Sequence, residues 1–309
     1  MSARDGRHEI RVGGRQVAVT RPGKEMFPED GITKEDLVAY YRAVARPMLA
    51  HVRDRPVTME RYPDGYHGPS FFHKDVPDHF PDWVRRVDVA KAGGTLEMAV
   101  CDDAATLAYL ANQACLTPHV WLSRAGRPDH PDRLVFDLDP PGDDFGLVRW
   151  AATEVRGLLT DAGLRPAVMT TGSRGAHVLA PLDAKAGFDE ARAFAHAAAD
   201  LLAARHPDRL TTEVRKDRRG GRLYLDVQRN AYAQTAVAPY AVRARPHAPV
   251  ATPLTWEEFT GGDIGPRHFT LRTLPERLAR SGDPWQGLRR EARSLTAARR
   301  RLDRIAARA

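Results

Sequence analysis

Short runs of apolar residues, many of them alternating with polar ones, recur along the chain and predict numerous strands separated by turns. His8–Val12 and Gln16–Thr20 alternate around Gly13-Gly14, which predicts a β-hairpin. Further strands or extended segments are predicted at 57–62, 96–100, 134–139, 167–171, 176–181, 223–227, 235–240 and 243–250.

A helical period separates several of these strands. Thr33 followed by Asp36 resembles a capping box that opens a helix reaching about Arg53, and Pro47 should kink or interrupt it. Other helices are predicted at 103–115, 145–162 and 188–204. Because strands and helices are mixed and no internal repeat is found, the pattern predicts an α/β or α+β class with a largely antiparallel sheet.

The last stretch, 286–309, predicts a basic C-terminal helix. Leu288, Leu295 and Leu302 recur at heptad spacing, with Ala298 and Ile305 beside them. We expect this apolar face to pack on the protein's own body. Docking of a partner is the alternative, and it is less favoured because three heptads are few.

Composition places the chain among ordinary globular proteins. Its 309 residues, 42% hydrophobic and 28% charged, suit one large domain or two small ones. No apolar run is long enough to span a bilayer, so no membrane association is expected. Cys101 and Cys115 are the two cysteines, and no signal peptide precedes them, which predicts reduced core thiols in a cytoplasmic protein.

The net charge of +7, dominated by arginine, favours a polyanionic partner, although a high arginine content can also reflect genomic composition. Basic residues concentrate late in the chain, at Arg215, Lys216, Arg218, Arg219, Arg222, Arg243 and Arg245. A polyanion passing a nearby site fits this distribution, and a solvated loop is the alternative.

An apolar strand carries two aspartates, Asp137 and Asp139, before the pair Pro140-Pro141. Side chains alternate along a strand, so both carboxylates should lie on one face, where a divalent cation such as Mg²⁺ or Mn²⁺ would relieve their repulsion. The alternative is a strand end leading into a solvated acidic turn, since Asp143 and Asp144 follow.

Asp226 ends another apolar strand. A third carboxylate facing the first two would complete a site for two divalent ions, which clamp the attacking and leaving oxygens of a phosphoryl displacement. A salt bridge from Asp226 to Arg229 is the alternative.

A glycine-containing turn separates two predicted strands at 170–177. Its glycines would let backbone N–H groups approach an anion, and Ser173 and Arg174 would add donors suited to a triphosphate. The alternative is a tight hairpin with a solvated Arg174. His177 begins the next strand, where it either reaches a phosphate or serves a structural hydrogen bond.

The order of these motifs resembles the polymerase domain of bacterial DNA ligase D, a member of the archaeo-eukaryotic primase superfamily. The order is Asp137-x-Asp139, then Thr171-Gly172-Ser173-Arg174-Gly175-x-His177, then Asp226 followed by Asn230. The segments 61–65, 71–74 and 237–245 are similar to that family as well, so the resemblance runs from about Val12 to Gly282.

The resemblance implies an α+β fold with a primase-type catalytic core, whose RRM-like sheet carries the carboxylates. It implies one catalytic module over 1–285 with two subdomains that divide near 120–133, followed by the helix at 286–309. It also implies template-dependent nucleotidyl transfer, in which two Mn²⁺ or Mg²⁺ ions assist and NTPs or dNTPs serve as substrates.

By resemblance, Asp137, Asp139 and Asp226 would be catalytic and hold the metal ions. Thr171, Ser173, Arg174 and His177 would bind the nucleotide triphosphate. His119 matches a histidine near the nucleotide sugar, and Arg243 matches an arginine at the triphosphate.

The resemblance also implies a DNA-binding surface. Lys24 and Lys34 match a pocket for the 5′-phosphate of a gap or break, and Phe71 and Phe72 match aromatics that stack on template bases. Arg219 matches a loop residue that shapes the primer terminus. The other residues expected to contact DNA are Arg61, Lys74, Lys216, and Arg85 and Arg86 of a surface loop at 85–94 used in pairing DNA ends.

Two positions depart from the family pattern. Arg174 fills a site that takes lysine or arginine, and Gln234 stands where many relatives have a lysine, which removes a charge near the triphosphate. Because the chain ends before a ligase or phosphoesterase domain, we expect a standalone, nucleoid-associated polymerase that works with a separate DNA ligase and a Ku-type end-binding protein.

Three other functions fit parts of the pattern. A glycosyltransferase also uses Asp-x-Asp with Mn²⁺, but it would not require Asp226 or the basic loops. A DNA-end-binding scaffold without catalysis would keep the lysines and aromatics. A true primase would start chains without a primer.

Overall fold

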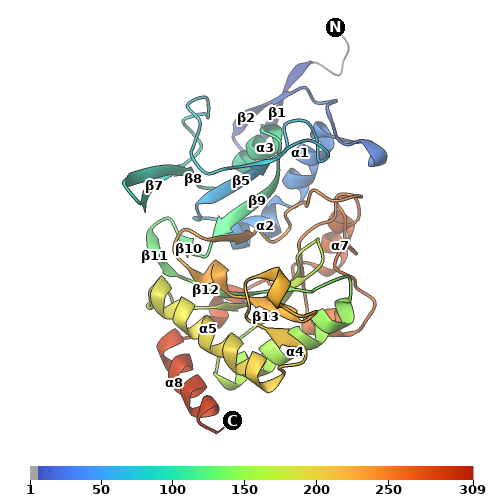
Figure 1. Cartoon of the computed structure of the whole chain (residues 1–309). Helices are drawn as coiled ribbons and strands as arrows, with labels where there is room; N and C mark the ends of the chain where they lie inside the picture. Colours follow the sequence, from blue (N-terminus) through green and yellow to red (C-terminus); the bar gives the residue numbers. More distant parts are fainter. Residues whose placement is uncertain (1–5, 309) are drawn as a thin grey trace. The chain divides into compact units, whose positions relative to one another are not determined.

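The computed structural model describes residues 6–308, and the chain divides into two compact units (Figure 1). The first unit contains the residues up to Trp121 together with 237–252 and 269–283. The second contains 122–236, 253–268 and the residues from Pro284 onward. The chain therefore passes between the units several times, first after Trp121.

The second unit is built on a six-stranded sheet ordered β15-β16-β12-β14-β13-β18. These strands are β15 (Leu210–Thr211), β16 (Leu223–Asp226), β12 (Arg133–Asp139), β14 (Ala176–Pro181), β13 (Ala167–Thr170) and β18 (Thr252–Leu254). β12 runs antiparallel to both β14 and β16, and β13 runs antiparallel to β14. The α+β class with a largely antiparallel sheet is therefore confirmed.

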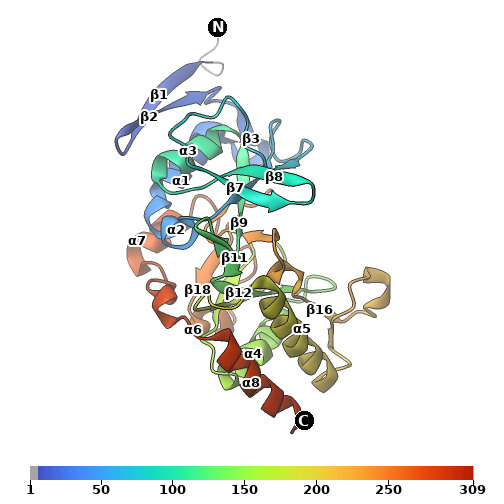
Figure 2. The same ribbon diagram turned by 90° about the vertical axis from the view of Figure 1, so that its left-hand side faces the viewer.

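Two long helices, α4 (Phe145–Asp161) and α5 (Phe188–Arg205), contact this sheet (Figures 1 and 2). Phe136 and Leu138 of β12 are fully buried, whereas Asp137 and Asp139 alternate with them and stay partly exposed. Alternation along one strand therefore sends apolar side chains into the core and carboxylates to the other face. Apart from the C-terminal elements described next, this unit also contains β10 (Ser123–Arg124), β11 (Arg127–Pro131), η3 (Lys216–Arg218), η4 (Gln228–Asn230) and α6 (Trp256–Thr260).

The C-terminal helix is shorter than predicted. α8 spans Leu295–Ala306, and Ser294 caps its start by accepting a hydrogen bond from the Ala297 backbone N–H. Leu288–Glu291 form the separate 3₁₀ turn η5. Gly287, in the left-handed region at φ +81°, precedes that turn. The expected packing holds for the helical part, because Leu295, Ala298 and Leu302 are buried and α8 contacts α5 and α4.

The first unit contains a sheet ordered β17-β9-β5-β6 and three two-stranded hairpins. The sheet strands are β17 (Thr235–Val237), within which the chain enters this unit, β9 (Cys115–Trp121), β5 (Val57–Arg61) and β6 (Phe71–His73). The hairpins pair β1 (Arg7–Val12) with β2 (Arg15–Thr20), β3 (Glu25–Phe27) with β4 (Ile32–Thr33), and β7 (Arg86–Lys91) with β8 (Gly94–Ala99). Its helices are α1 (Lys34–Ala43), α2 (Ala45–Val52), α3 (Ala104–Asn112) and α7 (Leu274–Ser281), with the short η2 (Pro28–Asp30) between β3 and β4.

The helix predicted from Thr33 to about Arg53 starts and breaks as expected. Thr33 and Asp36 form the capping box, each side chain bonding the other's backbone N–H. Val44 then separates α1 from α2. Pro47 accounts for the break, because it cannot donate to the carbonyl one turn earlier and its ring crowds that carbonyl.

The extended segment predicted at 243–250 is wrong. His247 and Ala248 adopt φ of +68° and +46°, and only an isolated bridge joins Val242 to Val250. Likewise β17 ends at Val237, and Tyr240 lies at φ +68°. Such conformations are unusual away from glycine, so residue type alone gave no warning.

None of the described helices is both long and apolar enough to cross a membrane.

Candidate functional site

Three neighbouring strands of the second unit bring four polar side chains into one row. In β12 the residue Asp137 lies directly opposite Asp226 of β16 on one side and His177 of β14 on the other. Asp139 follows two positions later on the same face of β12. The structure thus brings together the three aspartates that the sequence placed far apart.

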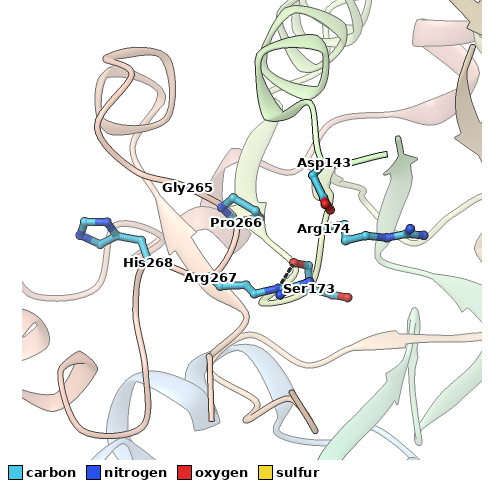
Figure 3. Close-up of a pocket in the computed structure, with 7 residues that line it drawn as sticks. All are labelled: Asp143, Ser173, Arg174, Gly265, Pro266, Arg267 and His268. Carbon is cyan, nitrogen blue, oxygen red and sulfur yellow. Dashed lines mark hydrogen bonds between the residues drawn. The ribbon is translucent and has the colours of Figure 1, made fainter. Parts of the chain in front are cut away.

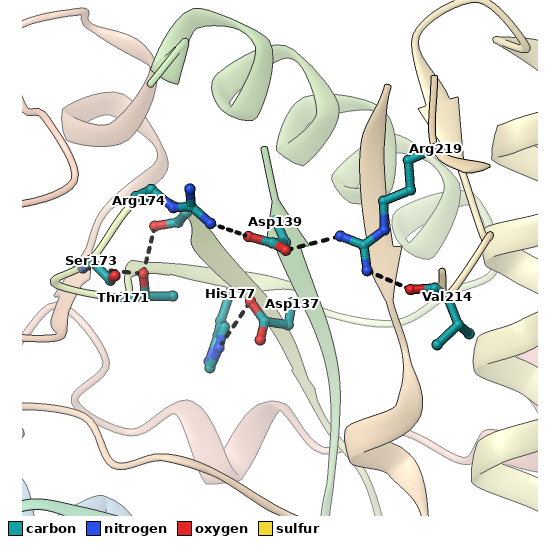
Figure 4. A network of polar contacts seen from close by, with 9 residues as sticks. Asp137, Asp139, Thr171, Ser173, Arg174, His177, Val214 and Arg219 are labelled. Carbon is teal, nitrogen blue, oxygen red and sulfur yellow. Dashed lines mark hydrogen bonds and ion pairs between the residues drawn. The ribbon is translucent and has the colours of Figure 1, made fainter. Parts of the chain in front are cut away.

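Two arginines hold Asp139 (Figure 4). Arg174 Nη2 lies 3.4 Å from Asp139 Oδ1, and Arg219 Nη1 lies 3.1 Å from Asp139 Oδ2. Arg219 also donates to the carbonyl of Val214, and its guanidinium lies over the Tyr224 ring at 3.9 Å from the centroid. The carboxylate of Asp139 is therefore neutralised by side chains from two different loops.

Asp137 has two weaker cationic neighbours. His177 Nε2 lies 3.5 Å from Asp137 Oδ1, and Arg229 Nε lies 3.8 Å from Asp137 Oδ2. The sequence offered Arg229 as a partner of Asp226, but the ion pair that forms is with Asp137. His177 is buried, so its position on the strand is fixed.

The pKa of Asp226 depends on its burial and on the charges around it. Burial raises the pKa of Asp226, and the neighbouring Asp137 and Asp139 carboxylates raise it further, against the hydrogen bond from the Gln228 backbone N–H and the charge of Arg229. Burial is thus the larger cause of the raised pKa, and repulsion from the other two aspartates adds to it. Added positive charge would stabilise the three carboxylates.

The donor set suits a divalent cation, because hard carboxylate oxygens on adjacent strands are the ligands that Mg²⁺ and Mn²⁺ prefer. In their present rotamers, however, no three His, Cys, Asp or Glu side chains among residues 6–308 converge to hold a metal ion. Asp139 instead faces Arg174 and Arg219. Binding of a cation by all three carboxylates requires Asp139 to exchange these partners.

A turn at residues 171–175 lies beside the aspartates, and we name it the phosphate-binding turn for the role proposed below. Both the backbone N–H and the hydroxyl of Thr171 bond the Gly175 carbonyl, and the Ser173 N–H bonds the Thr171 hydroxyl at 3.4 Å. Gly172 is in the left-handed region at φ +66°. A Cβ on Gly175 would lie 2.0 Å from the Leu138 carbonyl oxygen, so only glycine lets the turn approach β12.

The first unit carries a group of cationic side chains around the start of α1, Arg21, Lys24, Lys34 and Arg61, which we name the cationic pocket. Lys34 is the first residue of that helix, and its Nζ donates to the Thr20 carbonyl at 2.7 Å. Lys24 lies on the neighbouring segment, whose carbonyl at Lys24 accepts the Lys34 backbone N–H, and Lys24 Nζ lies 3.0 Å from Asp64 Oδ1. Burial, and then the charges of Arg21, Lys24 and Arg61, lower the pKa of Lys34 to about 8. An anion placed beside Lys34 would therefore favour its charged form.

Aromatic side chains are exposed on β6, an edge strand of this unit's sheet. Phe71 and Phe72 are 44% and 57% exposed, which is unusual for large apolar residues. The Arg61 guanidinium lies over the Phe71 ring at 5.4 Å from its centroid, and His119 meets the Phe72 ring edge-on at 5.4 Å. Such rings are suited to stacking on bases.

His119 and Arg243 both lie near Glu60 in the first unit. His119 Nε2 is 3.0 Å from Glu60 Oε2. Burial favours a higher pKa for Glu60, but the hydrogen bonds from His119 and Tyr62 and the charge of Arg243 outweigh it and lower that pKa. These two residues belong to a different unit from the three aspartates.

The other predicted DNA-binding residues lie on the surface in varied settings. Arg85 bonds Asp54 and Asp102, both at 2.9 Å, whereas Arg86 bonds Glu97 at 3.1 Å. Lys74 and Lys216 are exposed. The segment 85–94 forms β7 and the turn that leads into β8.

Comparison with known proteins now bears on these features. The family model described as "LigD, primase-polymerase domain" matches residues 33–285, which is most of the chain. The chain belongs to this family. The multifunctional non-homologous end joining protein LigD of Mycobacterium bovis is 36% identical over 278 residues, and the bifunctional protein of Bacillus subtilis is 34% identical over 272 residues.

A solved structure supports the assignment. The polymerase domain from Mycobacterium tuberculosis ligase D, in complex with DNA, matches with a TM-score of 0.84 and 36% identity, covering 90% of this chain and 99% of that one. The predicted primase-type core is therefore confirmed. The alignments take in 87% of this chain, but only 36% of the M. bovis protein and 44% of the B. subtilis protein.

Within this LigD primase-polymerase fold, two contacts were not predicted from the sequence. Arg267 bonds the Ser173 carbonyl although 94 residues separate them, and Asn230 locks η4 to β12 through hydrogen bonds with the backbone of Val135. The family's Asp-then-Asn order was a usable signal for Asn230, but an arginine-to-carbonyl contact leaves no pattern. Gln234 is exposed.

Proposed function

We propose that this protein is a template-dependent nucleotidyltransferase that fills short gaps or extends ends during DNA break repair by non-homologous end joining. The observation that carries the proposal is the meeting of Asp137, Asp139 and Asp226 on one sheet face beside the phosphate-binding turn. Family membership and the DNA-bound relative support it.

The reaction joins the primer 3′-oxygen to the α-phosphorus of an NTP or dNTP, and the bond from that phosphorus to the bridging oxygen of the β-phosphate breaks to release pyrophosphate. Two Mn²⁺ or Mg²⁺ ions, held by Asp137, Asp139 and Asp226, would lower the pKa of the 3′-hydroxyl and neutralise the phosphates.

Side chains of the second unit then have distinct tasks. Thr171 and Ser173 turn their hydroxyls to the triphosphate, for which Thr171 gives up its hydroxyl bond to the Gly175 carbonyl, and Arg174 exchanges Asp139 for a phosphate oxygen. Arg219 likewise leaves Asp139 and turns to the primer terminus. His177 and Arg229 keep Asp137 in place. From the first unit, His119 and Arg243 are proposed to contact the sugar and the triphosphate.

The cationic pocket and the exposed aromatics suit a DNA substrate with a 5′-phosphate. Lys24 and Lys34 would bind that phosphate at the downstream edge of a gap or break, while Phe71 and Phe72 stack on template bases. Arg61, Lys74, Arg85, Arg86 and Lys216 would add contacts to the DNA backbone. Filling leaves a nick that a DNA ligase must seal, and a Ku-type protein would hold the ends at the nucleoid.

Extension of a gapped, 5′-phosphorylated duplex with NTPs or dNTPs and Mn²⁺ tests the proposal. The wild type should extend the primer by template-directed addition, and the variant Asp137→Ala with Asp139→Ala should not. Equal extension by both proteins would overturn the roles of the aspartates. Synthesis on single-stranded template without a primer would instead identify a primase.

A further inference from the structure

The phosphate-binding turn is supported on two sides by different means. On one side Gly175 packs directly against the Leu138 carbonyl and Pro140 of the β12 end, with no space for a side chain. This contact fixes the last residue of the turn. The middle of the turn, Gly172-Ser173-Arg174, needs a separate support.

On the other side the turn borders a cavity of about 380 Å³ (Figure 3). The lining comprises Asp143, Ser173, Arg174 and the segment 265–268. Because this side is hollow, close packing cannot hold the turn there. A directed contact spans this side, from Arg267 Nε to the Ser173 carbonyl at 2.7 Å.

Arg267 is held by an anchored segment. Arg149 of α4 donates from Nε to the Phe259 carbonyl at 3.1 Å and from Nη2 to the carbonyls of Gly262 and Ile264 at 2.8 and 2.7 Å. Its guanidinium also lies over the Phe145 ring of α4, 4.9 Å from the centroid. A continuous series of contacts thus runs from α4 through Arg149 and the segment 259–267 to the turn.

We propose that Arg267 is a positioning residue that holds the phosphate-binding turn ready for the nucleotide triphosphate, an inference that rests on the function proposed above. By fixing the Ser173 carbonyl, Arg267 orients the peptide unit that joins Ser173 to Arg174, in the part of the turn proposed to meet the phosphates. Arg174 points away from Arg267 toward Asp139, so the two arginines act on different parts of the turn (Figures 3 and 4). Nucleotide affinity thereby depends on residues outside the motif.

The test compares Arg267→Met with Arg290→Met. Arg290 is an exposed arginine of the same unit, on η5, and its guanidinium makes no hydrogen bond or ion pair with another residue among 6–308. In primer extension, Arg267→Met should raise the KM for the nucleotide about tenfold, the size expected for losing a hydrogen bond from a charged donor, and change kcat less. Arg290→Met should match the wild type.

Amide hydrogen exchange supplies a readout that needs no catalysis. Peptides covering 171–176 should exchange faster in Arg267→Met than in the wild type or Arg290→Met, while the affinity for gapped DNA stays the same. A wild-type nucleotide KM and unchanged exchange in Arg267→Met would overturn the proposal. A wild type that never extends a primer would instead refute the proposed function, and the exchange comparison would still decide whether Arg267 orders the turn.

Discussion

The second unit gathers three carboxylates on a sheet face, whereas the first gathers lysines and arginines around the start of α1. The acidic row is assembled by pairing of distant strands, with Asp137 opposite Asp226, and borrows Arg174 and Arg219 as counterions. The cationic pocket forms between neighbouring segments, where Lys34 stays buried at a pKa of about 8.

This difference indicates which added charge each unit would favour. Burial, and then the neighbouring carboxylates, raise the pKa of Asp226, so a cation would stabilise its charged form. Burial, and then the neighbouring cations, lower the pKa of Lys34, so an anion would stabilise its charged form. Perturbed pKa values in opposite directions are typical of sites built for different ligands. Changes to the three aspartates should therefore leave the preference for a 5′-phosphate intact, and changes to Lys24 and Lys34 should leave primer extension intact.

The largest effect is expected for Asp226→Asn. Losing one of three carboxylates should lower primer extension by about 10²–10³-fold, since the charge that holds the cations falls while the shape is kept. The preference for DNA with a 5′-phosphate, measured by binding, should not change. Loss of both properties together would contradict the separation of tasks.

The converse change is Lys24→Ala with Lys34→Ala. Removal of two cations from the pocket should reduce the advantage of a 5′-phosphate by about 10- to 100-fold in DNA binding. Extension of a simple primer–template without a downstream strand should persist, and that substrate serves as the control. An undiminished phosphate preference would exclude this pocket.

Gly175→Ala probes the contact between the phosphate-binding turn and β12. The added Cβ would overlap the Leu138 carbonyl, so unfolding should become easier by roughly 1–3 kcal/mol and the nucleotide KM should rise. Gly142→Ala is the matched control, because a Cβ there meets no other atom of the described chain within 4 Å. Thermal unfolding and steady-state kinetics compare the two, and equal behaviour would argue against close packing at Gly175.

The smallest effect is a pH dependence. Lys34 is charged below its pKa of about 8 and neutral above it, so the preference for a 5′-phosphate should be constant near neutral pH and decline above pH 8. Lys34→Arg should abolish this decline, because arginine stays protonated. Binding measured from pH 6.5 to 9.5 checks both, and a wild-type preference that grows with pH would contradict the assignment.

Local signals in the sequence predicted much of the fold. The Thr33–Asp36 capping box and the Gly13-Gly14 hairpin need only neighbouring residues, and strand alternation placed Asp137 and Asp139 on one face. The alternative salt bridge from Arg229 to Asp226 does not form, and Arg229 pairs with Asp137 instead. The choice between these two aspartates depends on how β16 pairs with β12. Arg267 was missed because its acceptor is a backbone carbonyl, which every residue carries.

The central claim is that Asp137, Asp139 and Asp226 together hold divalent cations. Titration of the protein with Mn²⁺, followed by electron paramagnetic resonance of the free ion, measures this without DNA or nucleotide. The account predicts saturable Mn²⁺ binding by the wild type that is lost in Asp137→Asn with Asp139→Asn, whereas equal binding by both proteins would contradict it.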